Sequence, residues 1–343
     1  MDRANLDWKN LGFGLTPTDV NVRYHWRDGN WSLPEITSSQ DLSINIAATA
    51  LHYGQALFEG LKAFETPDGG VAIFRPQENA ERMSRGARKL LMPAPPTELF
   101  LEAVTEAVRQ NRRYVPPADS GASLYIRPLL IGTGARVGVK PADEYQFIIF
   151  VTPVGPYFKG GLKPISLRAE EEVHRAAPLG VGDIKAAGNY AAGMRATQRA
   201  IDHGFDNVLY LDSREGHWID ETGATNFFAI KSDHAGASYI TPRSMSILPS
   251  ITNNSLMTIA KELNMKVEHR PVSIDELGEF TEAGCCGTAA VLTPVGSIEW
   301  RGKTTTFHAD GREPGPWTRK LYDILTGIQY GRIADKHNWL LHV

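Results

Sequence analysis

The sequence predicts a protein of two domains that each mix helices and strands, α/β or α+β in class. Its 343 residues are about twice the usual size of one domain, roughly 150 residues. Segments with helical and with strand periodicity occur in both halves, and a Gly- and Pro-rich stretch at 153–164 separates them. We therefore expect an N-terminal domain at 1–154, an interdomain loop at 155–164 and a C-terminal domain at 165–343.

Composition excludes several classes of partner. The chain is 42% hydrophobic and 22% charged, which allows a sizeable core. Its net charge of −3, with no basic stripe, argues against nucleic acid. The longest apolar run, "FIIFV", is too short for a bilayer, and "MDRANLDWKN" has no signal-peptide character. Cys285 and Cys286 are adjacent, which rarely suits a disulfide. We expect a reduced, cytoplasmic protein that does not bind a membrane.

Turn and capping signals divide the first half into elements. Asp28–Gly29 and Pro67–Gly70 each separate two strand-like runs. Pro76 suits the first position of a helix, and Thr97 suits the cap of the next one. The signals predict hairpins at 20–36 and 59–75, helices from Pro76 and after Thr97, and strands at 123–131 and 145–154, the last one buried on both faces.

In the second half, hydrophobic residues again follow helical periodicity in some segments and strand periodicity in others. The patterns predict strands at 164–173, 207–212 and 238–242, a hairpin at 216–230, strands within 283–300, and helices at 194–204, from about Ser250, and at 315–331. No internal repeat and no low-complexity segment is present.

Several common catalytic motifs are absent or fail in context. "GTGARVG" at 132–138 has the wrong glycine spacing for a dinucleotide loop, and no helix start follows it. The ten histidines form no His-Glu-x-x-His motif and no Cys/His cluster, so no metal site is expected. A Gly-x-Ser-x-Gly elbow and a Walker loop are also missing.

Lys185, in "VGDIKAAGNYAAG", is the first candidate for chemistry. Its small neighbours would let a flat ring approach the backbone closely. A nucleophilic lysine also needs surroundings that lower its pKa. Taken alone, a solvated surface lysine is the more common interpretation, so companions are required.

Four further features supply such companions, each with an ordinary alternative. Glu221 can face a ring nitrogen or simply cap a turn. The helix start at Ser250 can bind a phosphate or be a plain N-cap, and Arg82 can complete a phosphate site or be solvated. The "GTAAVL" turn at 287–292 is suited to holding a small anion. Lysine, carboxylate, phosphate-binding helix and anion turn are together the parts of a pyridoxal 5′-phosphate site.

A family resemblance covers nearly the whole chain, from Phe13 to Gly331. "LHYGQALFEGLKAF", "FRPQENAERM", "SLYIRPLLIG", "GNY", "ETGATNFF", "CGTAAVLTPV" and "LYDILTGIQYG" occur in that order. The sequence thus resembles the branched-chain amino acid aminotransferases, which are pyridoxal phosphate enzymes of fold type IV. The resemblance implies a small N-terminal α/β domain, a larger C-terminal domain, the cofactor between them, and a homodimer.

The resemblance also implies cofactor-binding roles. Lys185 would form the covalent link to the cofactor and move the proton between Cα and C4′. Tyr190 would hydrogen-bond the 3′-oxygen, Glu221 would face the ring nitrogen, and Ala224 would lie behind the cofactor. The implied phosphate ligands are Arg82, the amides of Ile251 and Thr252, and Thr288.

Substrate roles follow from the same resemblance. Thr288 and Ala289, helped by Tyr53, would hold the α-carboxylate, and Arg127 would admit the second carboxylate of glutamate. The implied side-chain pocket consists of Phe58, Tyr125 and Tyr157, with Gly60 leaving room; a loop with Val137 and Val139 would reach into the pocket of the partner subunit.

Five positions depart from the family pattern. Cys286 stands where Ser is frequent, and Ala290 and Thr293 occupy the places of a redox cysteine pair found in some members. Ala224 replaces Gly or Thr, and Asp183 precedes the lysine where many members are less polar. We therefore expect no redox switch at the 287–292 turn.

The implied activity is reversible transfer of the amino group of L-leucine, L-isoleucine or L-valine to 2-oxoglutarate, giving the 2-oxo acid and L-glutamate. A D-amino acid aminotransferase or an aminodeoxychorismate lyase is the alternative within the fold type. A non-catalytic binding protein is a further alternative, which a cofactor band that responds to L-leucine would exclude.

Overall fold

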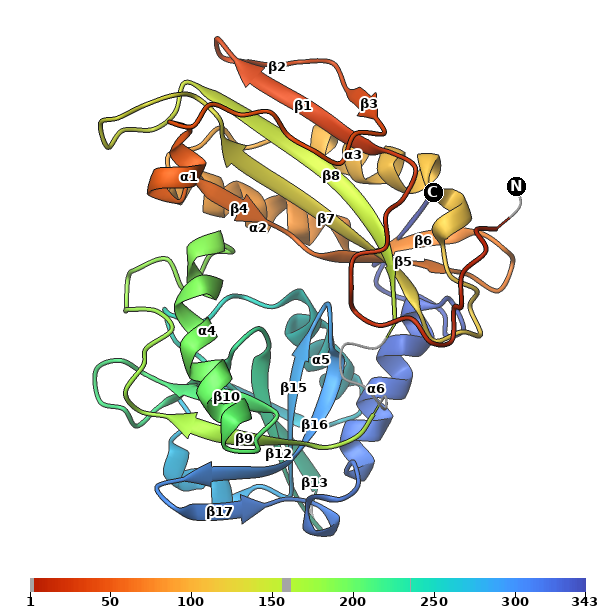
Figure 1. The fold of residues 1–343 in the computed structure, drawn as a ribbon. Coiled ribbons are helices and arrows are strands. Elements are labelled where there is room, and N and C mark those ends of the chain that lie inside the picture. Colours follow the sequence, from red (N-terminus) through yellow and green to blue (C-terminus); the bar gives the residue numbers. More distant parts are fainter. Residues whose placement is uncertain (1–2, 156–161, 235) are drawn as a thin grey trace. The chain divides into compact units, whose positions relative to one another are not determined.

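The protein forms two compact units, each with its own sheet (Figure 1). The structure is a computed structural model that describes residues 3–155, 162–234 and 236–343. Unit 1 comprises Met1–Tyr157, Ile184–Gly188 and Ile328–Val343, and unit 2 comprises Phe158–Asp183 and Asn189–Gly327. None of the helices in these described ranges is long and apolar enough to cross a bilayer.

Unit 1 contains a nine-stranded sheet in the order β18-β6-β5-β7-β8-β1-β2, with β3 beside β1 and β4 beside β7. The pairings between these strands are antiparallel. The strands are β1 (Asn21–Arg27), β2 (Asn30–Trp31), β3 (Glu35–Thr37), β4 (Ala56–Phe58), β5 (Leu61–Glu65), β6 (Val71–Phe74), β7 (Ser123–Gly132), β8 (Glu144–Val154) and β18 (Leu340–His342).

The predicted hairpins of unit 1 are confirmed, and the prediction of a strand buried on both faces is confirmed in part. Asp28 and Gly29 form the turn between β1 and β2 with φ of 52° and 82°, the left-handed conformation that a tight hairpin requires. The amide of Thr66 donates to the carbonyl of Gly70 across the turn between β5 and β6. Strand β8 lies between β1 and β7 in the sheet. One of its faces is buried throughout, whereas Glu144, Gln146 and Phe150 on the other face are only partly buried.

The helices of unit 1 are α1 (Thr49–Tyr53), α2 (Pro76–Lys89) and α3 (Thr97–Gln110), followed by the 3-10 turn η1 (Arg112–Tyr114). Pro76 begins α2 as predicted. The prediction that Thr97 caps α3 is wrong, because Pro96 takes the cap position and Thr97 is already helical. The fixed φ of proline (−52° here) is compatible with a helix start, but its ring offers no capping acceptor.

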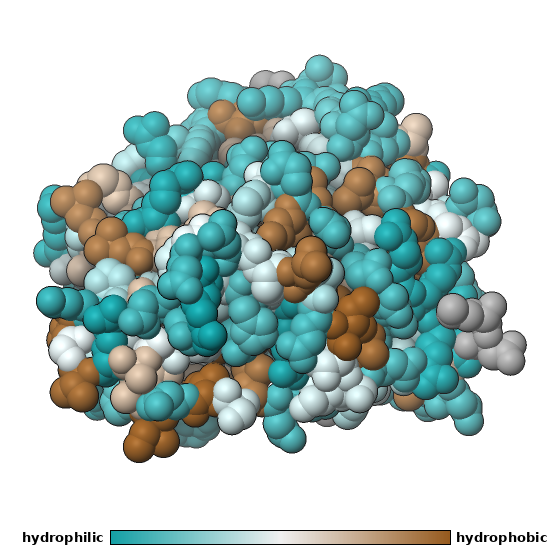
Figure 2. All heavy atoms as spheres, turned by 90° about the horizontal axis from the view of Figure 1, so that it is seen from above, coloured by the Kyte–Doolittle hydropathy of each residue, from teal (hydrophilic) through white to brown (hydrophobic). Residues whose placement is uncertain are grey.

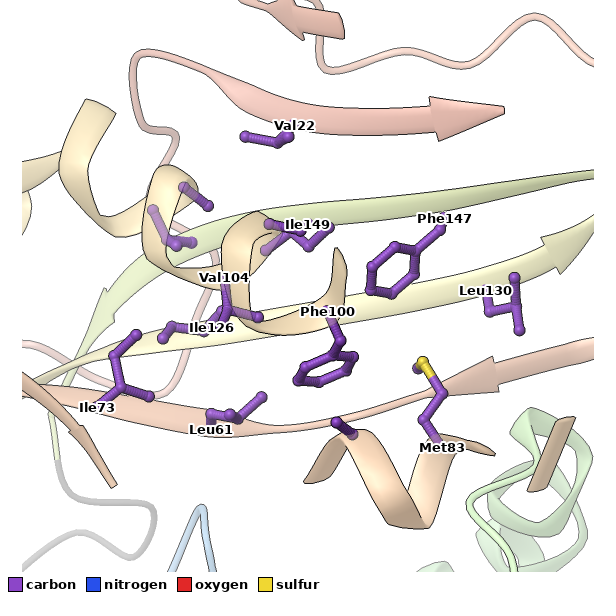
Figure 3. Packing of buried hydrophobic residues seen from close by; sticks show 14 of the residues in the cluster. Val22, Leu61, Ile73, Met83, Phe100, Val104, Ile126, Leu130, Phe147 and Ile149 are labelled. Carbon is purple, nitrogen blue, oxygen red and sulfur yellow. The ribbon is translucent and has the colours of Figure 1, made fainter. Parts of the chain in front are cut away.

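The core of unit 1 lies between its sheet and helices α2 and α3 (Figure 3). Phe100 and Val104 of α3 pack toward Ile126 of β7 and Phe147 of β8. The rings of Phe100 and Phe147 are stacked with centroids 5.7 Å apart. Each such side chain contributes about 1.5–3 kcal/mol by burial, so this face fixes β7 and β8 against the helices.

Unit 2 contains a second nine-stranded sheet, in the order β11-β10-β9-β16-β15-β12-β13-β14, with β17 beside β16. Because β11 also pairs with β12, the strands from β11 through β10, β9, β16 and β15 to β12 close into a ring. The strands are β9 (Ile165–Glu170), β10 (Asn207–Leu211), β11 (Ile219–Thr222), β12 (Asn226–Asp233), β13 (Gly236–Pro242), β14 (Lys266–Arg270), β15 (Glu282–Gly287), β16 (Val291–Trp300) and β17 (Lys303–Thr306).

The remaining helices are α4 (Ala187–Asp202), α5 (Ile251–Glu262) and α6 (Pro316–Gln329), with 3-10 turns η2 (Ile274–Glu279) and η3 (Ala309–Gly311). Ser250 caps α5 as predicted. Helix α4 begins at Ala187, earlier than the predicted 194–204, because alanines compensate for the glycines in its first turns. The elements α1, β4, β14, β17 and β18 were not predicted.

Two short segments from the second half of the chain group with unit 1. In the C-terminal segment, β18 pairs with β6, and Arg75 donates its amide hydrogen to the Trp339 carbonyl. The other segment, Ile184–Gly188, carries Lys185. The C-terminal domain expected from the sequence, 165–343, contains both segments.

Candidate active site

Lys185 is fixed to unit 1 by its own backbone. Its carbonyl accepts a hydrogen bond of 3.2 Å from the Phe58 amide, and Ala186 forms a β-bridge with Leu57. The side-chain nitrogen Nζ lies 4.6 Å from the centre of the Phe58 ring. The amine is therefore held over an aromatic face at the end of β4.

Burial and nearby arginines set the charge state of Lys185. Burial is the main cause that lowers its pKa from 10.5 to about 8, and the positive charge of Arg82 contributes next. Arg127 also lowers this pKa, whereas Glu59 raises it. A substantial fraction of the amine is neutral near pH 8, and the neutral amine is the form that acts as nucleophile or base.

Arg82 of α2 forms a two-point ion pair with Glu59, a residue that was not singled out from the sequence. Its Nε donates to Oε1 at 2.8 Å and a terminal nitrogen donates to Oε2 at 2.7 Å. Asn79 also donates to Oε2, at 2.7 Å. The side chains of Glu59 and Arg82 are 0% and 6% exposed. The available signal was an acid inside the apolar stretch "LFEGL".

The structure brings Phe58, Tyr125 and Arg127 together in unit 1. The guanidinium carbon of Arg127 lies 4.7 Å from the Phe58 ring centre and 5.2 Å from that of Tyr125. Arg127 also donates to the Tyr125 hydroxyl at 3.1 Å. A Cβ at Gly60 would lie 2.9 Å from Cζ of Tyr125, so glycine is needed there. These residues form an aromatic surface with a cation at its edge.

Tyr53 connects helix α1 to the loop between β7 and β8. Its hydroxyl donates to the Val137 carbonyl, so these two predicted residues are in contact. Val137 and Val139 are 88% and 81% exposed. In this described loop no helix follows Gly132.

Lys62 of β5 is a second buried lysine, and it was not predicted. Burial lowers its pKa from 10.5 to about 7. It lies opposite Tyr125 in the pairing of β5 with β7. A lysine within an apolar strand was the only signal for it in the sequence.

Glu221 of unit 2 lies in strand β11 rather than in a turn, and it is 4% exposed. Arg175 forms an ion pair with its Oε1 at 2.6 Å, and the Leu248 amide donates to the same oxygen at 3.2 Å. Asn226 donates to Oε2 at 3.3 Å. The carboxylate is thus buried and held from several sides, and Arg175 was not predicted.

The start of helix α5 offers backbone donors. Ser250 accepts a hydrogen bond of 3.1 Å from the Asn253 amide and so satisfies one of the unpaired N–H groups of the first turn. Ile251 and Thr252 are the first helical residues and are 6% and 4% exposed. Their N–H groups lie at the positive end of the helix dipole, a place suited to a phosphate.

The other predicted residues of unit 2 lie in turns and at a helix start. Thr288 and Ala289 lie in the turn between β15 and β16, and Ala224 lies in the turn between β11 and β12. Tyr190 is in the first turn of α4, and Asp183 is partly buried just before the Lys185 segment.

Cys286 lies beside Asn226 in the pairing of β15 with β12. Cys285 and Cys286 are both buried free thiols. Burial raises the pKa of Cys285 to about 12 and that of Cys286 well above its usual range. Neither thiol is therefore a ready nucleophile.

Tyr157 lies outside the described residues. Within the described residues, no group of three or more His, Cys, Asp or Glu side chains could hold a metal ion.

Comparison with known proteins identifies the family. A family model described as amino-transferase class IV matches residues 56–298, a span that includes Lys185, Glu221 and the start of α5. The chain therefore belongs to the class IV aminotransferases and is a transaminase by family. The predicted mixed α/β architecture of fold type IV is confirmed.

Curated relatives narrow the similarity further. The chain is 49% identical over 345 residues to a branched-chain-amino-acid aminotransferase of Haemophilus influenzae, covering 99% of both proteins. It is 47% identical over 341 residues to the branched-chain-amino-acid aminotransferase of Helicobacter pylori, covering 99% of this chain and 98% of that protein. The family resemblance found in the sequence is thereby confirmed.

Solved structures of branched-chain amino acid aminotransferases have a fold similar to that of this chain. The branched-chain amino acid aminotransferase of Escherichia coli matches with a TM-score of 0.78 at 28% identity, covering 92% of this chain and 98% of that one. The branched-chain amino acid aminotransferase of Thermobaculum terrenum, solved in its PLP form, matches with a TM-score of 0.77, covering 95% of this chain and 98% of that one. At 24% identity, the second match supports the fold alone.

Proposed function

We propose that this chain is a branched-chain amino acid aminotransferase. It transfers the amino group of L-leucine, L-isoleucine or L-valine to 2-oxoglutarate and gives the branched 2-oxo acid and L-glutamate. The observation that carries the proposal is the 49% identity to such an enzyme over essentially the full length of both chains.

The residues present fit pyridoxal 5′-phosphate as the cofactor. Unit 1 offers the half-buried Lys185, whose amine has a pKa of about 8 because of burial and of the positive charge of Arg82. Unit 2 offers a buried carboxylate at Glu221 and the backbone amides of the first turn of α5. We assign the covalent link to Lys185, the ring nitrogen to Glu221 and the 3′-oxygen to Tyr190. The phosphate is assigned to Arg82, Ile251, Thr252 and Thr288, with Ala224 behind the ring.

When bound, pyridoxal phosphate supplies an aldehyde for the amino group and a ring that accepts the electrons released at Cα. The chain supplies proton transfer: the neutral Nζ of Lys185 would take the proton from Cα of the amino acid and deliver it to C4′ of the cofactor, and it would move a proton from C4′ to Cα in the reverse half-reaction. Its lowered pKa keeps a useful fraction of Lys185 unprotonated near neutrality. Glu221 contributes a fixed negative charge that favours a protonated ring nitrogen.

The aromatic surface of unit 1 suits both substrates. Phe58 and Tyr125 offer apolar area for a branched side chain, and Arg127 at their edge offers a partner for the second carboxylate of glutamate. Gly60 keeps this surface open, because any side chain there would displace the Tyr125 ring. We assign the α-carboxylate to Thr288 and Ala289, with Tyr53 assisting, and a further pocket wall to Tyr157.

We further propose that the enzyme is a cytoplasmic homodimer. In unit 1 the side chains of Val137 and Val139 are largely exposed, as are Ile46 (87%) and Leu51 (60%). Figure 2 shows one face on which hydrophobic residues form small groups between hydrophilic ones. Exposed apolar side chains of this kind favour burial against a second copy, and Val137 and Val139 are the residues proposed to reach the pocket of that copy.

A donor panel tests the proposal. With 2-oxoglutarate as acceptor, L-leucine, L-isoleucine and L-valine should each give glutamate, whereas D-alanine should not. Lys185→Ala should lower the rate by at least about 10²-fold, the range typical of a lost proton-transfer group. Lys266→Ala, at a side chain 74% exposed, is the matched control and should leave the rate unchanged. Equal activity of Lys185→Ala and the control would contradict the proposal.

A further inference from the structure

The ion pair between Arg175 and Glu221 is among the most deeply buried in unit 2. Their side chains are 9% and 6% exposed, and the nitrogen–oxygen distance is 2.6 Å. Neither charge has bulk water to stabilise it, so each depends on the other. This dependence distinguishes the pair from exposed ones such as Lys231–Glu279, at 53% and 57% exposed.

Arg175 is itself anchored to the backbone. Its terminal nitrogen donates to the Ser246 carbonyl and, at 3.4 Å, to the Gly182 carbonyl. The Leu248 amide, two residues after Ser246, donates to Glu221. The segment 246–248 therefore holds both members of the pair, and the position of the guanidinium is fixed before any ligand binds.

The two oxygens of Glu221 have different partners. Oε1 receives Arg175 and the Leu248 amide, whereas Oε2 receives the longer hydrogen bond from Asn226 at 3.3 Å. Asn226 is fixed in turn by a 3.0 Å bond to the Leu248 carbonyl. The shortest of these contacts, the ion pair with Arg175, is made through Oε1, and together these contacts orient the carboxylate.

Burial of a carboxylic acid favours its neutral form, and an adjacent permanent cation reverses that preference. Arginine stays protonated at any pH at which the protein folds, so its charge is always present. A neutral carboxylic acid beside a pyridine nitrogen could not stabilise a proton on that nitrogen by charge. A companion cation thus favours the chemistry assigned to Glu221, and Arg175 is in place to be that companion.

We propose that Arg175 is a positioning residue that keeps Glu221 ionised and correctly oriented toward the ring nitrogen of the cofactor. Arg175 touches neither cofactor nor substrate in this role and acts only through Glu221. The inference rests on the proposed function, since it needs Glu221 to face that nitrogen.

The test measures binding of two cofactors to the full-length protein freed of cofactor. One is pyridoxal 5′-phosphate, and the other is its 1-deaza analogue, in which carbon replaces the ring nitrogen. The wild-type protein should bind the natural cofactor more tightly, and Glu221→Gln should lose most of this preference. Arg175→Gln removes the charge but keeps a hydrogen-bond donor, and it should lower the preference by about 10-fold or more, the size of a charge-assisted hydrogen bond.

Two further variants sharpen the result. Arg175→Lys keeps the charge but cannot reach both Glu221 and the backbone carbonyls, so it should lower the preference by a smaller factor, about threefold. This variant also carries the test if Arg175→Gln does not fold. The double variant Arg175→Gln/Glu221→Gln should show no further loss of preference, because both changes act on the same hydrogen bond.

A purely structural role gives a different pattern. If the Arg175 variants weaken both cofactors by the same factor, or leave the preference unchanged, the inference is wrong. If the wild type and Glu221→Gln both lack any preference, the assignment of Glu221 to the ring nitrogen fails instead, and with it that part of the proposed function.

Discussion

Removing the charge of Glu59 should destabilise the protein severely. The change Glu59→Gln leaves the Arg82 guanidinium buried without its counter-charge, since the two side chains are 0% and 6% exposed. It also replaces one acceptor oxygen of a two-point contact, with bonds of 2.8 and 2.7 Å, by a donor that opposes the guanidinium. Breaking a buried pair in this way costs about 3–5 kcal/mol.

The exposed pair Arg27–Glu144 is the matched control. It has the same 2.8 Å separation as the Nε bond of Arg82, but its side chains are 67% and 40% exposed. Glu144→Gln should therefore cost about 0–1 kcal/mol. Both pairs belong to unit 1, so the same unfolding transition reports on them.

Urea unfolding of the cofactor-free protein at fixed protein concentration measures how much each of the two variants, Glu59→Gln and Glu144→Gln, loses in free energy of unfolding. Glu59→Gln should lower the midpoint by about 1 M or more, at a typical slope of 1–3 kcal/mol per molar urea. Replacing both partners with Glu59→Gln/Arg82→Met should recover much of the loss, because no buried charge remains. A cost for Glu59→Gln as small as that of Glu144→Gln would refute the reasoning.

Four more outcomes are expected. The rate at which an amine reagent modifies Lys185 in the cofactor-free protein should reach half its maximum near pH 8 rather than 10.5, because burial, then Arg82, disfavours the charged form; a midpoint near 10 contradicts this. The folded pKa lies below the unfolded one, so the contribution of Lys185 to stability should rise with pH between about 8 and 10.5. Gly60→Ala should cost about 1–3 kcal/mol in thermal unfolding by overlap with Tyr125, and Gly14→Ala, where a Cβ would meet nothing within 4 Å, should cost much less. Ser250→Ala should cost about 1 kcal/mol through the lost cap, more than Thr258→Ala within α5; equal costs would contradict a capping role.

Local signals in the sequence predicted most of the regular elements. Hairpin turns such as Asp28–Gly29 and helix starts such as Pro76 depend on backbone preferences of a few residues, so they can be read without the fold. The short strands β4 and β18 were missed because they contain only three residues each and are defined by pairing with β7 and β6. Such pairings join distant segments, and no local pattern specifies them.

Some residues of the candidate site could likewise be predicted from local sequence, and others could not. Lys185 and Glu221 stood out through their neighbours and through family motifs. Their ion-pair environment did not: Glu59 lies 23 residues from Arg82 in the sequence, and Arg175 lies far from Glu221. Partners of this kind become visible only when the strands and helices that carry them are assembled.

The path of the chain between the two units limits how the protein can be divided. Unit 1 includes Ile184–Gly188 and Ile328–Val343 in addition to Met1–Tyr157, so neither unit is one uninterrupted stretch of sequence. A polypeptide ending at residue 157 would lack strand β18, leaving β6 as an open sheet edge, and would also lack Lys185. A gene fragment ending at residue 157 should therefore yield an aggregation-prone product, and the sheet of unit 1 is complete only once Leu340–His342 has been synthesised.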